Sequence, residues 1–471
     1  MVKSIYENPH AFRFESIEIK TDRTTKTIDA FRITSELTIY EHIDKPFITG
    51  RIVFVDIDPT FALVDKVHFL GTEKIKVKIR TNESEKFTIT KNFIVTEVIS
   101  SIKNPDGQEV ITLDMIEDVA YHSSLMRVSK SFKGTKDEII KKLIEGVERE
   151  LLIKRNADIT GDKLTKLIVP NMHPLEAANW IKDRTYTSDG FPYFLYSTIA
   201  DDKLRLLDLK TILNEKAMNR DTLDYTYSMA FAQQSKEFTS GVRNDIFKPI
   251  DIHREAFTIT SVSQRNVESH LQLARMGMTS SQYNFIDTTT GNNIKVEHDM
   301  SKKYLSMIEN QVLRAEADTF YPVYDHNFRI GKKLEEFDKF STREITHFAT
   351  SRQFNDFADT ESYQEGKTVS DHEQKVQAKS LRHWLLKSAL TIQLPGKNFL
   401  MKEKNMTIGN IIRCRFLANV EPAKNMTEKQ ITDLKKSGEY MIYSARHQFT
   451  NQQYHVTMDM GRLGTRGYGI H

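Results

Sequence analysis

The sequence has a single cysteine, Cys414, among its 471 residues. One thiol cannot form an intrachain disulfide, and paired-cysteine metal and redox motifs are excluded for the same reason. Cys414 lies in the alternating apolar and basic segment Ile412–Phe416, which is typical of a strand. We therefore expect a buried, inert thiol rather than a nucleophile.

The chain also lacks an excess of charge of either sign and a long hydrophobic run. Its 67 basic and 64 acidic residues leave a net charge of +3, which gives no argument for nucleic acid as a ligand. The longest apolar run, Phe191–Ala200, is too short to span a bilayer, and the first residues do not resemble a signal peptide. We expect a protein without a membrane-spanning segment that is made and kept soluble in a cytoplasm.

No phosphate-binding Walker loop, GxGxxG, GxSxG or HExxH motif occurs in the sequence. Asp56 and Asp58 could act as a carboxylate pair, but they lie at a strand end, where Asp is common in turns. We interpret His173 as a residue packing locally at a helix start, and His447 as a neutral core histidine bonded to backbone. Four more histidines lack metal-ligand spacing and are expected to be solvent-exposed: His298, His326, His347 and His372. The sequence predicts no catalytic, cofactor-binding or metal-binding residue, and no cofactor.

The last segment of the chain reads as a β-hairpin, Gly438–Arg462. A turn at Thr450 to Gln453 sets Phe449 opposite Tyr454 and Tyr443 opposite Met460. One face is then apolar except for His447, and the other is polar, which is typical of a sheet with one face on a core.

A similar hairpin occurs near the start of the chain, over Phe93–Glu117. Ile111–Met115 matches Val456–Met460 in character, and upstream Ile75–Arg80 has the same alternation as the strand that contains Cys414. We interpret the two regions as copies of one antiparallel β domain, with Val77 equivalent to Cys414 and Thr112 to Thr457.

Helical patterns separate the two β regions. Thr135 and Glu138 form a capping box before an apolar stripe that runs to Leu151, and Pro174 opens a second helix. The predicted fold class is α+β: two duplicated antiparallel β-barrel tube domains, an α/β module between them, and a charged insertion in the second. The predicted units are a first tube-like β-barrel domain (1–128), the module (129–240), the start of the second tube-like domain (241–299), the insertion (300–372) and the completion of the second domain (373–471).

Several motifs resemble those of one family. They are Glu36–Glu41 with Pro46 and Gly50–Asp56, then Gly71–Glu73, Ile168–Pro170, Pro174–Ala177 with Trp180, and Gly438–Tyr440 with Arg446, His447 and Tyr454. Together with the duplication, they resemble the baseplate hub proteins of contractile-tailed bacteriophages, which are related to the upper part of type VI secretion spike proteins. The resemblance covers most of the chain apart from the insertion.

The resemblance implies a structural, non-enzymatic protein of the virion tail baseplate, assembled in the host cytoplasm. It implies a homotrimer in which two β domains per chain form a ring of near six-fold symmetry. The implied partners are the tail spike protein, the tail tube or tube-initiator protein and neighbouring baseplate proteins, with DNA only passing through the lumen. The alternatives are a tail-associated cell-wall hydrolase, for which no segment remains to hold a catalytic domain, and a host-binding tail protein.

Overall fold

The structure is a computed structural model. It describes residues 9–21, 27–57, 67, 69–80, 88–105, 108–153, 165–227, 255–264, 272, 275–276, 280–286, 293–299, 303, 306–307, 344–348, 372–387, 390–400, 407–417, 432–433, 436–450 and 453–462. Asp58, His326 and most of the charged insertion lie outside these residues.

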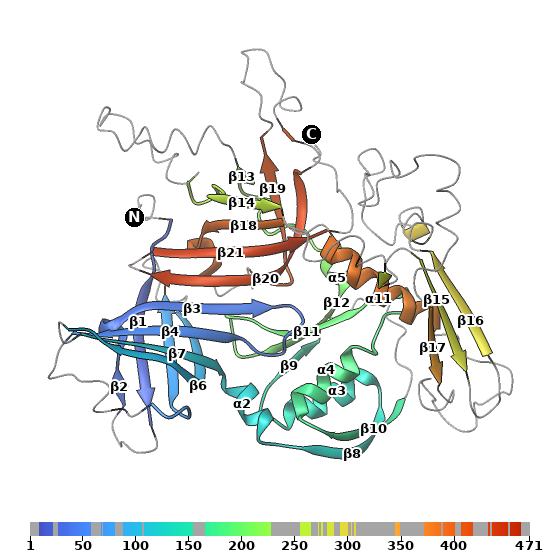
Figure 1. Cartoon of the computed structure of the whole chain (residues 1–471). Coiled ribbons are helices and arrows are strands. Elements are labelled where there is room, and N and C mark those ends of the chain that lie inside the picture. Colours follow the sequence, from blue (N-terminus) through green and yellow to red (C-terminus); the bar gives the residue numbers. More distant parts are fainter. Residues whose placement is uncertain are drawn as a thin grey trace, which may run out of the picture.

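One 13-stranded sheet joins strands from the beginning and the end of the chain (Figure 1). The first unit contributes β1 (Arg13–Lys20), β2 (Ile28–Asp29), β3 (Thr34–His42), β4 (Thr49–Asp56), β5 (Lys74–Arg80), β6 (Thr88–Lys103) and β7 (Glu109–Glu117), with the short helix η1 (Phe31–Ile33) before β3. The second unit contributes β13 (Tyr225–Tyr227), β14 (Ser261–Gln264), β18 (Leu390–Pro395), β19 (Ile411–Phe416), β20 (Gly438–Thr450) and β21 (Gln453–Gly461), with η5 (Lys397–Leu400) after β18. The α+β class with a predominance of antiparallel strands is therefore confirmed.

The sheet is open along its main path, which runs β14-β18-β21-β20-β3-β4-β7-β6-β5-β1-β2. β19 and β13 branch from this path, because β19 pairs with β20 and β13 pairs with β19. Among the described strands neither unit closes into a barrel, so barrel closure stays a prediction. The alternation of apolar residues, such as Leu37 and Ile39 in β3, turns one face of the sheet inward.

The two units share a strand order. In the first unit the order is β5-β6-β7-β4-β3, and in the second it is β19-β20-β21-β18-β14, with antiparallel pairing at every step. The units differ at one flank, where β1 pairs with β5 antiparallel but β13 pairs with β19 parallel.

Both hairpins carry a β-bulge at the corresponding place. One extra residue, Thr96 in β6 and Tyr443 in β20, interrupts the pairing with the following strand. The pairs on either side of the bulge are Val95 with Met115 and Glu97 with Asp114 in the first unit, and Ile442 with Met460 and Ser444 with Asp459 in the second. The predicted pairing of Phe449 with Tyr454 is confirmed, whereas that of Tyr443 with Met460 is wrong because the bulge moves Ile442 into that position.

The α/β module lies beside the first unit (Figure 1). Its helices are α2 (Asp118–Ser124), α3 (Lys136–Glu145), α4 (Pro174–Lys182) and α5 (Leu209–Asn214), and its strands are β8 (Val128–Gly134), β9 (Leu151–Ile153), β10 (Thr165–Met172), β11 (Tyr193–Ser197) and β12 (Leu204–Asp208). β8 pairs with β10, and β12 lies between β11 and β9. The predicted capping box begins α3, but the helix ends before Gly146, so Leu151 belongs to β9 rather than to the helical stripe.

A separate sheet consists of β15 (Ser280–Ile286), β16 (Asn293–Asp299) and β17 (Glu344–Phe348), and the helix α11 (His372–Lys387) precedes β18. From the sequence, β15 and β16 were expected in the second β domain. They pair instead with each other and, through β15, with β17, a strand inside the charged insertion. Local alternation predicts that a strand exists but does not specify its partner.

The buried apolar side chains form two clusters. One cluster contains residues of both β units, from Ile17 to Met460, together with Leu381 and Leu385 of α11. The other belongs to the module and contains residues from Val119 to Leu206. The two β units therefore share one core.

Candidate functional site

The two β units meet where β20 pairs with β3, and we call this contact the junction. β20 has two neighbours on the same side. Its first residues, Gly438–Met441, pair with β19, and its remainder, Ser444–Thr450, pairs antiparallel with Glu36–His42 of β3. The bulge at Tyr443 separates these two halves of the strand. A single long strand thus completes the second unit and joins it to the first.

A buried polar group lies at the centre of the junction. His447 of β20 is 3.1 Å from Glu41 of β3 (Nε2 to Oε2) and 2.7 Å from the hydroxyl of Tyr454 of β21 (Nδ1 to Oη). The other carboxylate oxygen of Glu41 accepts a hydrogen bond from the backbone N–H of Ile199 in the module. All three side chains are fully or almost fully buried. The group therefore links both β units and the module at one point.

The ionised form of Glu41 is stabilised by this environment. Burial raises the pKa of a carboxyl group, but the positive charge of His447 and hydrogen bonds from His447, Ile199 and Thr407 lower it. The net result is that the pKa of Glu41 lies below its ordinary value of 4.5. A buried carboxylate with these partners acts as a fixed acceptor.

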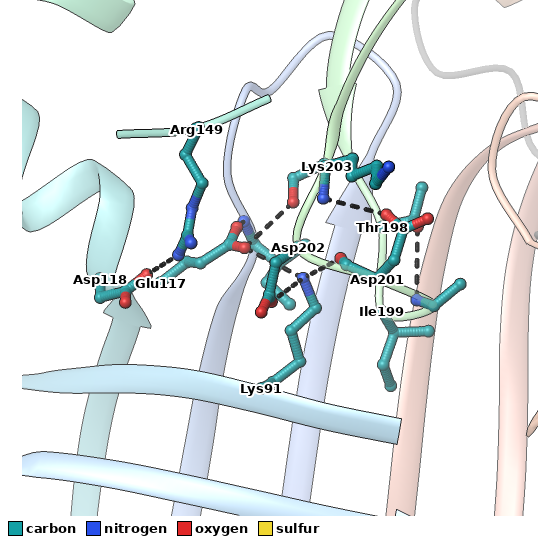
Figure 2. Close-up of polar contacts among 12 residues, drawn as sticks. Lys91, Glu117, Asp118, Arg149, Thr198, Ile199, Asp201, Asp202 and Lys203 are labelled. Atoms are coloured by element: carbon teal, nitrogen blue, oxygen red, sulfur yellow. Dashed lines mark hydrogen bonds and ion pairs between the residues drawn. The ribbon is translucent and has the colours of Figure 1, made fainter. Parts of the chain in front are cut away.

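A second buried group attaches the module to β6 and β7 (Figure 2). Lys91 Nζ lies 3.0 Å from Glu117 Oε1 and 3.4 Å from Asp202 Oδ1, and the side chains of Lys91 and Glu117 are each 1% exposed. Glu117 also accepts hydrogen bonds from the Ser197 hydroxyl (3.2 Å) and the Ile48 backbone (3.1 Å). Next to this group, Arg149 forms an ion pair with Asp118. The contacts join the large sheet to the turn between β11 and β12.

A third group joins α4, α11 and the connection between β3 and β4. The fully buried Lys182 of α4 pairs with Asp44 and, at 2.8 Å, with Asp183. Arg382 of α11 contacts the same two carboxylates at 3.4 and 2.9 Å, and it donates to the Tyr193 carbonyl at 2.7 Å. Burial raises the pKa of Asp44, but the charges of Arg382 and Lys182 lower it by more. The net pKa of Asp44 is therefore below its ordinary value.

These three groups have a common arrangement. Each places buried charges against opposite charges and backbone groups that come from distant segments of the chain. Breaking such a pair leaves an uncompensated buried charge, which costs about 3–5 kcal/mol. The arrangement can therefore fix the relative positions of the β units and the module, which is a structural role.

The residues considered from the sequence fall in several places. Cys414 is buried and free, and burial raises the pKa of its thiol, as expected of an inert thiol. His173 caps α4, with its Nδ1 2.8 Å from the Met126 carbonyl, which confirms local packing. His447 is buried as expected, but it bonds to side chains rather than to backbone. The backbone of its strand is already paired on both sides, so only side chains remain for the ring.

The expectation for His298 is wrong, and that for the Asp56 and Asp58 pair is only partly covered by the described residues. His298 is 8% exposed, so the expectation of a solvent-exposed imidazole is wrong for this residue. Asp56 is buried at the end of β4, and its proposed partner Asp58 lies outside the described residues. The side chains of His347 and His372 also lie outside the description.

In the part of the chain that the structure describes, no group of three or more His, Cys, Asp or Glu side chains is arranged to hold a metal ion. None of the helices described there has both the length and the apolar character needed to cross a membrane.

Of the residues in the buried polar groups, the sequence analysis identified His447 as a core residue and missed the charged partners, although a signal for three of them is present. Glu41 follows Leu37 and Ile39 in the inward phase of β3, and Lys91 lies between the inward residues Ile89 and Phe93 of β6. Glu117 likewise follows Leu113 and Met115 in β7. A charge in the apolar phase of a strand predicts a buried ionic contact. Its partner is not predictable from local sequence.

Comparison with known proteins gives similarity only at the level of structure. No family model and no curated protein matches the sequence. Among solved structures, the 43 kDa tail protein of prophage MuSo2 from Shewanella oneidensis is 8% identical, with a TM-score of 0.50 over 95% of this chain and 98% of that chain. A tail protein from Neisseria meningitidis MC58 is 10% identical, with a TM-score of 0.47 over 96% and 97%.

A third similar structure is an E. coli component of the type VI secretion system, described as structurally similar to the T4 bacteriophage tail proteins gp27 and gp5. It is 9% identical, with a TM-score of 0.39 over 98% of this chain and 79% of that chain. The prophage tail protein with a TM-score of 0.50 comes from the group of proteins that the sequence resembled. This chain shares the fold of the Shewanella tail protein over nearly its whole length.

Proposed function

We propose that this chain is a structural hub of a phage tail baseplate. Three copies form a ring of pseudo-six-fold symmetry, which adapts the tail tube to a three-fold spike and leaves a channel for DNA. The observation that carries the proposal is the pair of β units with one strand order, in a chain that shares the fold of a phage tail protein. Three chains with two related units each supply six similar positions around a ring.

The relation between the two units extends to individual residues. Val77 faces Lys91, and Lys91 lies four residues before Val95, which precedes the bulge in β6. Cys414 faces Gly438, and Gly438 lies four residues before Ile442, which precedes the bulge in β20. Thr112 and Thr457 each lie three positions before the methionine that pairs next to the bulge. These pairings support the equivalence of Val77 with Cys414 and of Thr112 with Thr457, and so a duplication.

In this proposal the β units occupy residues 1–128 and 241–471, interrupted by the insertion at 300–372, and residues 129–240 form the module. Two elements cross these bounds, because α2 packs in the core of the module and β13 pairs with β19 of the second unit. The spike, the tube or its initiator and neighbouring baseplate proteins are the partners, and the protein acts in the virion tail after assembly in the host cytoplasm. We assign it no catalytic step, because its buried charged groups are engaged with one another and with backbone rather than presented to a substrate.

Native mass spectrometry tests the proposal. The purified chain, alone or mixed with its spike partner, should give a closed trimer, and images of that species should have a central channel. A strict monomer in both samples, or a dimer with two-fold symmetry, would contradict the hub function.

A further inference from the structure

One stretch of sheet edge remains open in the first unit. β5 pairs with β6 only over Thr88–Ile94, and the rest of β6, Glu97–Lys103, has β7 on one side and no described strand on the other. Three large apolar side chains on this stretch are exposed: Val98 (37%), Ile99 (42%) and Ile102 (56%). Natural proteins protect or pair such edges, because an exposed apolar edge strand is a template for another chain.

The second unit shows what covers the equivalent edge. The counterpart of this stretch is Ser444–Phe449 of β20, one residue shorter because Ile99 forms a second bulge in β6, and β3 of the first unit covers it at the junction. Phe449 in that stretch is fully buried, whereas every residue of Glu97–Lys103 except Ser100 is exposed. The same strand position is thus covered in one unit and open in the other.

The second unit also contains a counterpart of β3, the strand that covers β20, and one edge of this counterpart is open. In the first unit β3 pairs with β4 on one side and with β20 on the other. Its counterpart in the second unit is β14, which pairs with β18 on one side and with no other described strand. The chain therefore carries one half of the junction on each unit: on β14, at one end of the path, and on the part of β6 that β5 does not pair with, inside the path.

We infer that, in the trimer proposed above, β6 of one subunit pairs antiparallel with β14 of the next and repeats the junction between subunits. The inference rests on the proposed function, and it names the strands that close the ring. Copies joined in this way contact head to tail. Around the ring, the junction of β20 with β3 inside each chain then alternates with the contact of β6 with β14 between chains. A heterologous contact of this kind generates a closed ring when its rotation matches the symmetry.

The register follows from the junction. At the junction Gln448 faces Thr38. The counterpart of Gln448 in β6 is Ile102, because the residues that they pair with, His455 and Val110, occupy equivalent places in β21 and β7. The counterpart of Thr38 in β14 is Ser263, because Arg51 and Thr391, which they face, are equivalent in β4 and β18. Ile102 should therefore face Ser263 of the next subunit. The neighbouring pairs are Ser101 with Gln264 and Lys103 with Val262.

Cysteine crosslinking tests this register. In the chain carrying Ile102→Cys and Ser263→Cys, mild oxidation should link neighbouring subunits into a covalent trimer on a denaturing, non-reducing gel. Both positions are exposed in the single chain, and the native Cys414 is buried and unreactive. The matched control carries Val98→Cys with Ser263→Cys. Val98 pairs with Leu113 and Ile102 with Val110, so Val98 lies three pairing positions, or about 10 Å, further along the strand. That is beyond the roughly 7 Å between Cα atoms that a disulfide can bridge.

The outcomes separate this inference from the hub function. A covalent trimer with the first pair and none with the control supports the inference. A native trimer in which the first pair stays unlinked, or in which the control links instead, overturns the strand pairing and leaves the hub function standing. A link inside one chain overturns the pairing because β6 is then covered by its own chain. A monomer in native mass spectrometry, with and without the spike, overturns both.

Hydrogen exchange on the unaltered protein gives a second measurement. In the trimer, amides of Glu97–Lys103 that point away from β7 should be protected to a degree similar to those of Ser444–Thr450 at the junction. Fast exchange of these amides in an intact trimer would contradict the inference.

Discussion

The buried contact between His447 and Glu41 makes the junction sensitive to acid. The folded-state pKa of Glu41 lies below its ordinary value of 4.5, so its contribution to stability is fully present above that pH. The contribution is lost as the pH falls through the folded-state pKa, because the carboxylate is then protonated. The protein should unfold more readily below about pH 4.5 for this reason.

Urea denaturation between about pH 3 and pH 6 tests the acid sensitivity in the parent and in Glu41→Gln. The variant should be less stable at neutral pH and should lose less stability on acidification. Glu15→Gln, at an exposed position of β1, is the matched control and should follow the parent. Parallel curves for the parent and Glu41→Gln would contradict the assignment.

Lys91 and Glu117 give a second prediction for single residues. Lys91→Met removes the cation and leaves the buried carboxylate of Glu117 without its charge partner, so we expect a loss of about 3–5 kcal/mol in the free energy of unfolding. Adding Glu117→Gln should recover part of this loss, since no uncompensated charge then remains. Lys76→Met, in the outward phase of β5, should change stability little. A loss for Lys91→Met no larger than that of Lys76→Met would show that the pair is not coupled.

For strands, the register of the last hairpin predicts opposite effects at neighbouring positions. Met458 is fully buried and faces Ala445 and Ile392, whereas Thr457 lies on the other face beside Arg446. Met458→Asp buries an unpaired carboxylate and should leave the protein insoluble, while Thr457→Asp should be tolerated. The soluble fraction after expression measures the difference, and Met458→Leu controls for the loss of methionine. Equal tolerance would show that the register is wrong.

The strands also show which parts of the fold were predictable. β3, β4, β5 and the two long hairpins follow from alternation of apolar residues, and α3 and α4 from their capping signals, because these depend on neighbours in the sequence. The junction of β20 with β3 and the sheet of β15, β16 and β17 depend on contacts between distant segments. The partners of Glu41 and Lys91 were hidden for the same reason, since a strand pattern specifies a face but not the strand that packs on it.

For the whole molecule, the shared core and the three buried polar groups indicate that the two β units and the module act as one body. A hub that carries load between a tube and a spike needs such coupling, because units that moved independently would not keep a ring in register. The open edges of β6 and β14 then belong to one rigid sheet, with β14 at one end of its path and β6 between β7 and β5. Rigidity fixes the angle between these edges, and that angle decides whether a ring closes.

The proposed passage of DNA gives a prediction for the proposed trimer. The 67 basic and 64 acidic residues of the sequence nearly balance, so a channel lined by this chain should pass duplex DNA without binding it tightly. Binding to duplex depends on phosphate contacts with Lys and Arg, and it weakens as salt rises because released counterions no longer drive it. Fluorescence anisotropy with a labelled duplex, on the trimer and at about 50 and about 200 mM salt, should show weak binding at the lower concentration and none at the higher. Tight binding that persists at the higher concentration would mean that the basic residues gather along the lumen, and it would contradict passage without retention.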